Sequence, residues 1–290
     1  MEWLTKSTWH RVIVSAVFAA LICLFLACCV HVGNTDDDWS MSLFLSGRID
    51  GGGLSLFIGA PLSQIIFLLN SLAPSLNWFF VLEHLTAFLS FWLLCYAALT
   101  WSGMASGFAV TGAMLAFILP NCISTSNFTY VAFLAVASGE FLLVASIRDP
   151  DAGAPAFLLA VALVALGSLW RLQMMLLSMP LFAVATAWSV WSERDDRALV
   201  TRRAAISALS ILVACGLLYA YDRAVWQQDG WREWEAYNGL RAEISDYPMP
   251  KYDEISGELA NLGMWPLTRS IAPEFLSGRR RTLAARGTTA

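Results

Sequence analysis

The sequence predicts an all-α polytopic membrane protein with about seven transmembrane helices and surface-lying helices in its first outer loop. The chain has 290 residues, of which 58% are hydrophobic and only 14% are charged, and its mean hydropathy is +0.60. A soluble domain of this size usually carries about 25% charged residues. The net charge of −4 gives no support to nucleic-acid binding. Membrane lipid is therefore the first expected partner.

Eight apolar segments are long enough, or nearly long enough, to cross a membrane. About 20 helical residues at 1.5 Å each span the hydrocarbon layer of a bilayer. The candidate segments are 12–32, 54–73, 78–100, 106–120, 128–147, 154–170, 172–191 and 204–221.

Positive charges predict which side of the membrane each loop faces. Lys6 and Arg11 precede the first segment, and the loop 192–203 contains Arg194, Arg197, Arg202 and Arg203. Both places should be cytoplasmic, because cytoplasmic loops carry the excess of Lys and Arg. An even number of crossings must then separate them, although seven candidates precede the loop, so one of the seven does not cross.

The segment 54–73 is the weakest candidate for a crossing. Gly59 and Pro61 interrupt it, and Gln64 and Asn70 add polar groups. A proline inside a helix costs about 3 kcal/mol. We therefore expect this segment to form one or two helices along the outer membrane surface. The alternative is that the short segment 106–120 fails to cross instead.

The chain is expected to divide into a transmembrane part, residues 1–221, and an outer-face segment, residues 222–290. The first part includes the first outer loop, 33–77. After Asp222, aromatic residues alternate with charged ones, as Trp231 and Trp234 do with Arg232 and Glu233. Such a segment fits the interface between lipid and water. This topology places the amino terminus in the cytoplasm and the carboxyl-terminal segment outside it.

Three carboxylates follow the first apolar run directly, at Asp36, Asp37 and Asp38. Neighbouring carboxylates cannot all ionise freely, so such a cluster either binds a cation or holds one member with a raised pKa. One of them could act as a general base, and Asp36 and Asp37 are candidates for a divalent cation such as Mg²⁺, Mn²⁺ or Ca²⁺. The alternative is a hydrated acidic helix end without a task.

Four other polar residues are candidates for binding a substrate together with Asp38. Arg171 lies between two apolar segments, and a cation at the centre of a membrane helix costs about 2.5–3.5 kcal/mol. It should therefore occupy an outer turn, where its guanidinium fits a phosphate, although it could also contact lipid phosphates. The remaining candidates are Glu83 and His84 near the outer end of 78–100, and Asn121 in a polar strip.

Several motifs, taken in order, resemble segments of bacterial GT-C-type membrane glycosyltransferases over residues 1 to about 250. The motifs are Asn34-x-Asp36-Asp37, Met41, Ser46-Gly47, Pro74-x-x-Asn77-Trp78, Thr129-Tyr130-Val131-Ala132, Arg171 and Tyr237-Asn238-x-x-Arg241-Ala242-x-Ile244-x-Asp246-Tyr247-Pro248.

The resemblance implies inverting transfer of a sugar from a polyprenyl-phosphate donor to a glycan or lipid acceptor at the outer face of the bacterial inner membrane. Asp36 or Asp37 would be the base, and Arg171 would hold the donor phosphate. Related enzymes continue through further spans after the equivalent of Pro248, so this chain looks shortened and a partner subunit could supply the missing helices. Two alternatives stay open: a transporter or flippase of a lipid-linked substrate, and a non-catalytic subunit.

Overall fold

The computed structural model describes residues 8–29, 36–48, 53–124, 127–149, 153–192, 196–228, 230–236 and 238, and this part of the chain is all-helical. The side chains of residues 8, 29, 36, 102–105 and 117–124 lie outside the description. The chain forms two compact units, 1–231 and 232–290. The architecture below concerns the first unit, because few residues of the second are described.

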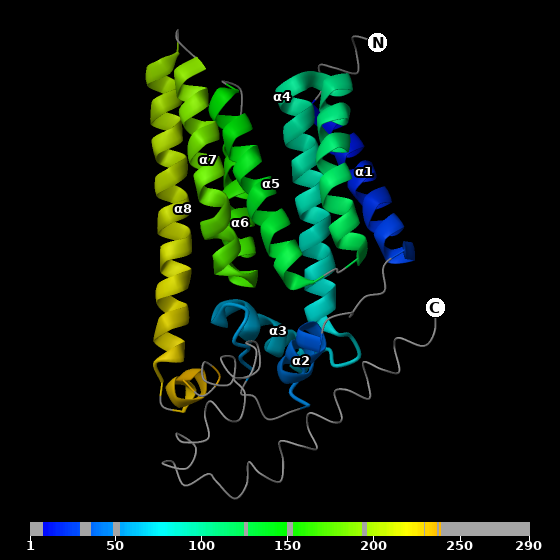
Figure 1. The fold of residues 1–290 in the computed structure, drawn as a ribbon, viewed down its shortest axis with the longest axis vertical. Coiled ribbons are helices and arrows are strands. Elements are labelled where there is room, and N and C mark those ends of the chain that lie inside the picture. The colour runs from blue at the N-terminus through cyan, green and yellow to red at the C-terminus, as the bar shows by residue number, and fades with distance from the viewer. Residues whose placement is uncertain are drawn as a thin grey trace, which may run out of the picture. The chain divides into compact units, whose positions relative to one another are not determined.

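Eight helices make up the described part of the first unit (Figure 1). They are α1 (Thr8–Cys29), α2 (Asp36–Leu45), α3 (Ala60–Leu72), α4 (Trp78–Ser124), α5 (Phe128–Arg148), α6 (Ala154–Trp170), α7 (Leu172–Ser192) and α8 (Arg197–Trp226).

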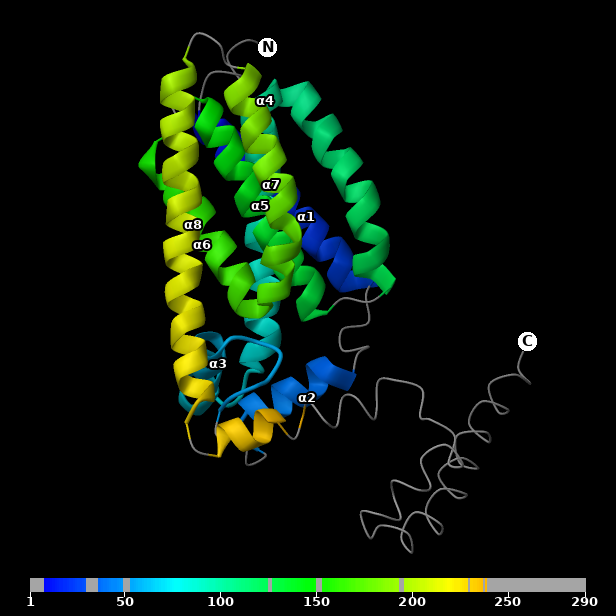
Figure 2. The ribbon, with the colours of Figure 1, turned by 60° about the vertical axis from the view of Figure 1, so that its left-hand side comes forward.

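Helix α4 is a hairpin of two antiparallel limbs, as both ribbon views show (Figures 1 and 2). A Cβ added to Gly107 would lie 2.7 Å from the Cα of Leu99. In a straight helix these two residues would be about 12 Å apart. The chain therefore reverses between Trp101 and Ser106, and each limb corresponds to one apolar segment of the sequence.

Five of the described helical segments are long and apolar enough to cross a membrane. They are Trp9–Cys28, Trp78–Trp101, Phe128–Arg148, Leu172–Ser192 and Arg197–Trp226. Three shorter apolar helices are Ala60–Leu72, Ser106–Ala116 and Ala154–Trp170. The expectation of an all-α chain with several apolar helices of membrane-spanning length is confirmed.

The apolar helices run up and down in one bundle, and α2 and α3 lie together at one end of it (Figure 1). We call α2, α3 and the segments 53–59 and 73–77 the layer. The near end of the bundle is the end beside the layer, where α4 and α5 begin, α6 meets α7 and α8 ends. The far end holds the start of α1, the reversal of α4 and the start of α8.

Small residues bring α5 and α6 into close contact in the bundle. A Cβ added to Gly167 would lie 2.6 Å from Cγ2 of Val136, and one added to Gly139 would lie 2.7 Å from the carbonyl oxygen of Ala160. Glycine on both helices therefore lets the two backbones approach, as small residues do in membrane bundles.

Helix α3 does not cross the bundle because it is too short. Its 13 residues extend about 20 Å, less than the hydrocarbon thickness. Pro61 lies in its first turn, where proline is compatible with a helix. The structure thus places 60–72 in a single helix of the layer, within the segment for which one or two surface helices are predicted.

Polar contacts from distant parts of the chain hold α3 at both of its ends. At its start, the amide of Ala60 donates to Oδ1 of Asp222 at 2.7 Å, and the amide of Gly59 donates to the carbonyl of Leu169 at 2.6 Å. At its end, Nδ2 of Asn70 donates to the carbonyl of Leu45 at 2.9 Å. These contacts join α3 to α8, α6 and α2.

The predicted boundary at 221/222 falls inside α8, and the first compact unit continues to Trp231. Trp226 is only 4% exposed and packs edge-on against Trp231, with ring centroids 5.5 Å apart. It shares an apolar cluster with Leu54 and Ala60. Trp226 therefore stabilises the attachment of the layer to α8.

Candidate functional site

Helix α2 divides its side chains between the interior and a groove. Asp38, Met41, Ser42 and Leu45 are each at most 2% exposed, and their spacing places them on one helical face. Met41 and Leu45 pack on Phe79 and Trp170 in an apolar cluster beneath the layer. The helical phase therefore turns the third aspartate of the cluster toward the bundle.

Asp38 and Glu83 form a buried acidic pair. Asp38 is 1% exposed, Glu83 is 4% exposed, and the two carboxyls lie within electrostatic range of one another. Two carboxyl groups buried together cannot both stay charged unless a proton or a cation accompanies them. The helical phase of α2 and of the first limb of α4 brings these two predicted residues together.

Asp37 is exposed at the start of α2, and Asp36 begins the helix with a side chain outside the described residues. Within the part of the chain that is described, no group of three or more His, Cys, Asp or Glu residues comes together in a way that could hold a metal ion. The cation site predicted at Asp36 and Asp37 includes a side chain, that of Asp36, which lies outside the described residues.

Arg171 forms the one-residue connection between α6 and α7. Its backbone is extended, with φ −163° and ψ 106°, and its amide still donates to the carbonyl of Gly167. Its Nη1 donates to Oγ1 of Thr129 at 2.5 Å, and its guanidinium carbon lies 5.5 Å from the centre of the Phe128 ring. The arginine is half-buried at the near end, at a turn as the sequence predicts.

One hydrogen bond and one ring contact connect the neighbourhood of Arg171 to that of the acidic pair. The indole of Trp170 donates to Oγ1 of Thr86 at 3.0 Å. Phe79 meets the Trp170 ring edge-on, with centroids 5.4 Å apart. Thr86 lies on α4 less than one turn after Glu83. The near end therefore carries both the acids and the arginine, held by packed aromatic rings.

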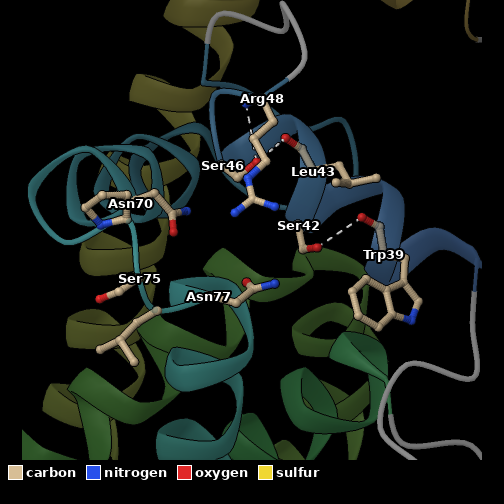
Figure 3. A pocket seen from close by; sticks show the side chains of 10 residues that line it. Trp39, Ser42, Leu43, Ser46, Arg48, Asn70, Ser75 and Asn77 are labelled. Atoms are coloured by element: carbon tan, nitrogen blue, oxygen red, sulfur yellow. Dashed lines mark hydrogen bonds between the residues drawn. The ribbon is translucent and has the colours of Figure 1, made fainter.

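A groove of about 200 Å³ opens between α2, α3 and the start of α4 (Figure 3). Its lining residues are Trp39, Ser42, Leu43, Ser46, Arg48, Asn70, Pro74, Ser75, Leu76 and Asn77. Figure 3 shows the guanidinium of Arg48 turned inward toward the amide of Asn77. No motif of the sequence points to Arg48, yet it is the only Lys or Arg between Arg11 and Arg148. A lone cation in so long a stretch of sequence could have marked Arg48 as a candidate binding residue.

The two remaining predicted site residues, His84 and Asn121, both belong to α4. His84 is exposed, and its Nδ1 bonds the carbonyl of Phe80 in its own helix at 2.7 Å. Asn121 is in the last part of α4, and its side chain is outside the described residues. Glu140, an ionisable residue inside a predicted span, is 5% exposed in the bundle and accepts a hydrogen bond from Ser178 at 3.0 Å.

The fold and this arrangement define a class: a multi-helix protein with apolar helices of membrane-spanning length and its polar candidate residues gathered at one end. No family model matches this chain, and no curated protein or solved structure matches it either.

Proposed function

We propose that this protein is a membrane glycosyltransferase that moves a sugar from a polyprenyl-phosphate donor to an acceptor on the extracytoplasmic face. The observation that carries the proposal is the assembly at one end of the bundle of Asp37, Asp38, Glu83 and Arg171, which lie far apart in the sequence. A carboxylate and a guanidinium at the same water boundary are what transfer from a lipid phosphate requires.

The charges at the far end support an orientation in which the layer faces the extracytoplasmic side. The far end carries Arg148, Arg197, Arg202 and Arg203 near the ends of α5 and α8. An excess of arginine in short loops favours the cytoplasmic side. The layer then faces outward, and seven crossings follow if the second limb of α4 and α6 also span.

The proposed chemistry is a single displacement. A carboxylate at the start of α2 takes the proton of the acceptor hydroxyl as its oxygen bonds to the anomeric carbon of the sugar. The bond from that carbon to the donor phosphate breaks, and the lipid phosphate leaves with the electron pair. One displacement inverts the anomeric configuration. Exposed Asp37 is accessible to an acceptor from water, and Asp36 is the second candidate for this base.

The buried groups have supporting roles in this proposal. Arg171 would stabilise the charge that develops on the leaving phosphate. Asp38, beside Glu83, would hold the first turn of α2 in place and keep negative charge close to the base. Loss of the base should stop transfer, whereas loss of a positioning residue should slow it.

The test compares cell-envelope glycans between the wild type and the Asp36→Asn, Asp37→Asn and Asp38→Asn variants at matched protein levels. Asp196→Asn is the matched control, because Asp196 is an exposed acid at the far end. At least one of the Asp36 and Asp37 variants should lower the glycan product by about 100-fold or more, the range of general base catalysis. Glycan profiles that are equal in all variants would remove the enzyme proposal.

A transporter of a lipid-linked substrate is the second candidate, and the Glu140–Ser178 pair favours it. A carboxyl group buried in the bundle beside a hydroxyl on α7 is a feature of ion or substrate pathways. For a transporter, Asp36→Asn and Asp37→Asn leave substrate movement intact, while Arg171→Ala stops it. A non-catalytic subunit is insensitive to all three changes.

A further inference from the structure

We infer that the groove around Arg48 binds the phosphate group of a membrane lipid. The groove is open on one side and has walls from α2, α3 and the segment before α4 (Figure 3). Its lining residues include one cation and no acid. The guanidinium therefore meets no carboxylate among the lining residues, and a bound anion would supply its negative partner.

The polar atoms that face the groove suit a phosphate. Arg48 presents a planar set of donors that fits two phosphate oxygens at once. The side-chain amide of Asn77 lies across from it (Figure 3) and offers two further donors. Asn77 also precedes the first residue of α4, and a helix start favours negative charge.

The frame of the groove is fixed by bonds that do not use these donors. Asn70 donates to the carbonyl of Leu45 at 2.9 Å and accepts from the amide of Trp78 at 3.3 Å. The hydroxyl of Ser46 donates to the carbonyl of Leu43 at 2.7 Å. These bonds join the end of α2, the end of α3 and the start of α4. The cavity is therefore preorganised, and Arg48 and Asn77 are left to face a ligand.

The rim of the groove indicates a lipid rather than a free phosphate. Trp39 is 49% exposed, Leu43 is 38% exposed and Leu76 is 49% exposed, and all three line the groove. Beside it begins the apolar segment Trp78–Trp101. A ligand with an anionic head and an apolar tail would satisfy the guanidinium and cover the exposed rim.

Arg171 is not among the lining residues of this groove. A lipid phosphate bound here is therefore distinct from the donor phosphate proposed at Arg171, and its binding does not depend on the transfer chemistry. Trp39, on the groove wall, follows Asp38 directly and packs on Phe80 with ring centroids 5.4 Å apart. A phosphate held by Arg48 would thus lie beyond the last turn of α2, the helix whose first turn carries the candidate bases.

The experiment measures binding of octyl phosphate to the protein in detergent. Binding is detected as a rise in the midpoint temperature of thermal unfolding. Inorganic phosphate and octanol are the comparison probes. We expect octyl phosphate to bind at least tenfold more tightly than either. Arg48→Gln should weaken its binding by about tenfold or more, since bonds to charged groups are among the strongest. Arg197→Gln, an exposed arginine at the far end, should leave binding unchanged.

The following outcomes would overturn the inference. Equal affinity of wild type and Arg48→Gln would exclude the groove, and inorganic phosphate binding as tightly as octyl phosphate would exclude a lipid. Should Arg48→Gln fail to fold, Asn77→Ala replaces it with an expected loss of about threefold, and unchanged binding there counts against the groove. Asp37→Asn should bind octyl phosphate normally, so a failure of the transferase proposal remains distinguishable from a failure of this site.

Discussion

The α5–α6 interface and the layer are held together in opposite ways. At the interface, Gly139 and Gly167 let two backbones touch, and neighbouring side chains fill the remaining space. In the layer, a few hydrogen bonds and two apolar clusters attach short helices to the end of the bundle. The candidate chemistry lies on the layer and the turns beside it. The helices of the bundle thus position functional groups that are carried by short helices and turns at its end.

The largest effect should come from adding one methyl group at the interface. In Gly167→Ala, the new Cβ would lie 2.6 Å from Cγ2 of Val136 and 2.8 Å from the carbonyl oxygen of Ala132. Overpacking of this kind costs about 1–3 kcal/mol in the free energy of unfolding. We expect a value at the upper end of this range, because the carbonyl of Ala132 belongs to the backbone and cannot rotate away.

Thermal unfolding in detergent measures this change. Gly112→Ala is the control, because nothing lies within 4 Å of its added Cβ, and it should stabilise the helix by about 0.5–1 kcal/mol. Two variants that shift the midpoint in the same direction would show that the interface is not closely packed.

The next effect concerns the buried bond that connects α4 to α6 at the near end. In Thr86→Val, the indole of Trp170 loses its acceptor at 3.0 Å, and an unsatisfied buried donor costs about 1–3 kcal/mol. We expect the free energy of unfolding to fall by about 1.5 kcal/mol, which is measured as a lower midpoint temperature of thermal unfolding.

Thr100→Val is the control for that change. The hydroxyl of Thr100 donates only to Tyr96 in its own helix, so its loss should have little effect. A similar midpoint for the two variants would mean that the Trp170 bond contributes nothing.

A smaller, local effect should follow from Asp222→Ala. This change removes the carboxylate that accepts from the amide of Ala60 at the start of α3, and the loss of a cap costs about 1 kcal/mol. Hydrogen exchange in the first turn of α3 should become about fivefold faster, while exchange in α5 stays the same. Asp222→Asn keeps an acceptor oxygen and should have less effect. Uniform acceleration over both helices would contradict the distinction between layer and bundle.

The smallest effect should come from Tyr221→Phe. The phenol of Tyr221 donates to Oε1 of Gln64 at 2.7 Å, and both side chains are exposed. A single hydrogen bond in contact with water contributes about 0.5 kcal/mol. Exchange at the middle of α3 should rise about twofold. A change as large as that of Asp222→Ala would show that the hydroxyl, rather than the carboxylate, attaches α3.

The apolar segments could be predicted from the sequence because hydropathy and length decide them. The ranges 78–100, 128–147, 154–170 and 172–191 coincide closely with the limbs and helices observed. Loop charges and the parity of crossings also predicted that the aspartates and Arg171 lie at one end. These properties are local or additive along the chain, so no tertiary contact is needed to infer them.

The details of the candidate site needed tertiary structure. A helix over 36–45 was not predicted, although acids in a first turn suit a helix start. Only its phase against the bundle decides that Asp38 is buried and Asp37 is exposed. The groove at Arg48 arises from three segments brought together by Asn70, a residue that the sequence presents as a mere interruption of an apolar run.

The contact between Ala60 and Asp222 joins residues 162 positions apart. During translation, Asp222 is synthesised only after the helices that precede α8. Until then the amino end of α3 lacks this acceptor, and Leu54 lacks its neighbours Val225 and Trp226. Completion of the layer is thus a late event in biogenesis, and chains interrupted before α8 should expose α3 to proteases even when the preceding helices have inserted.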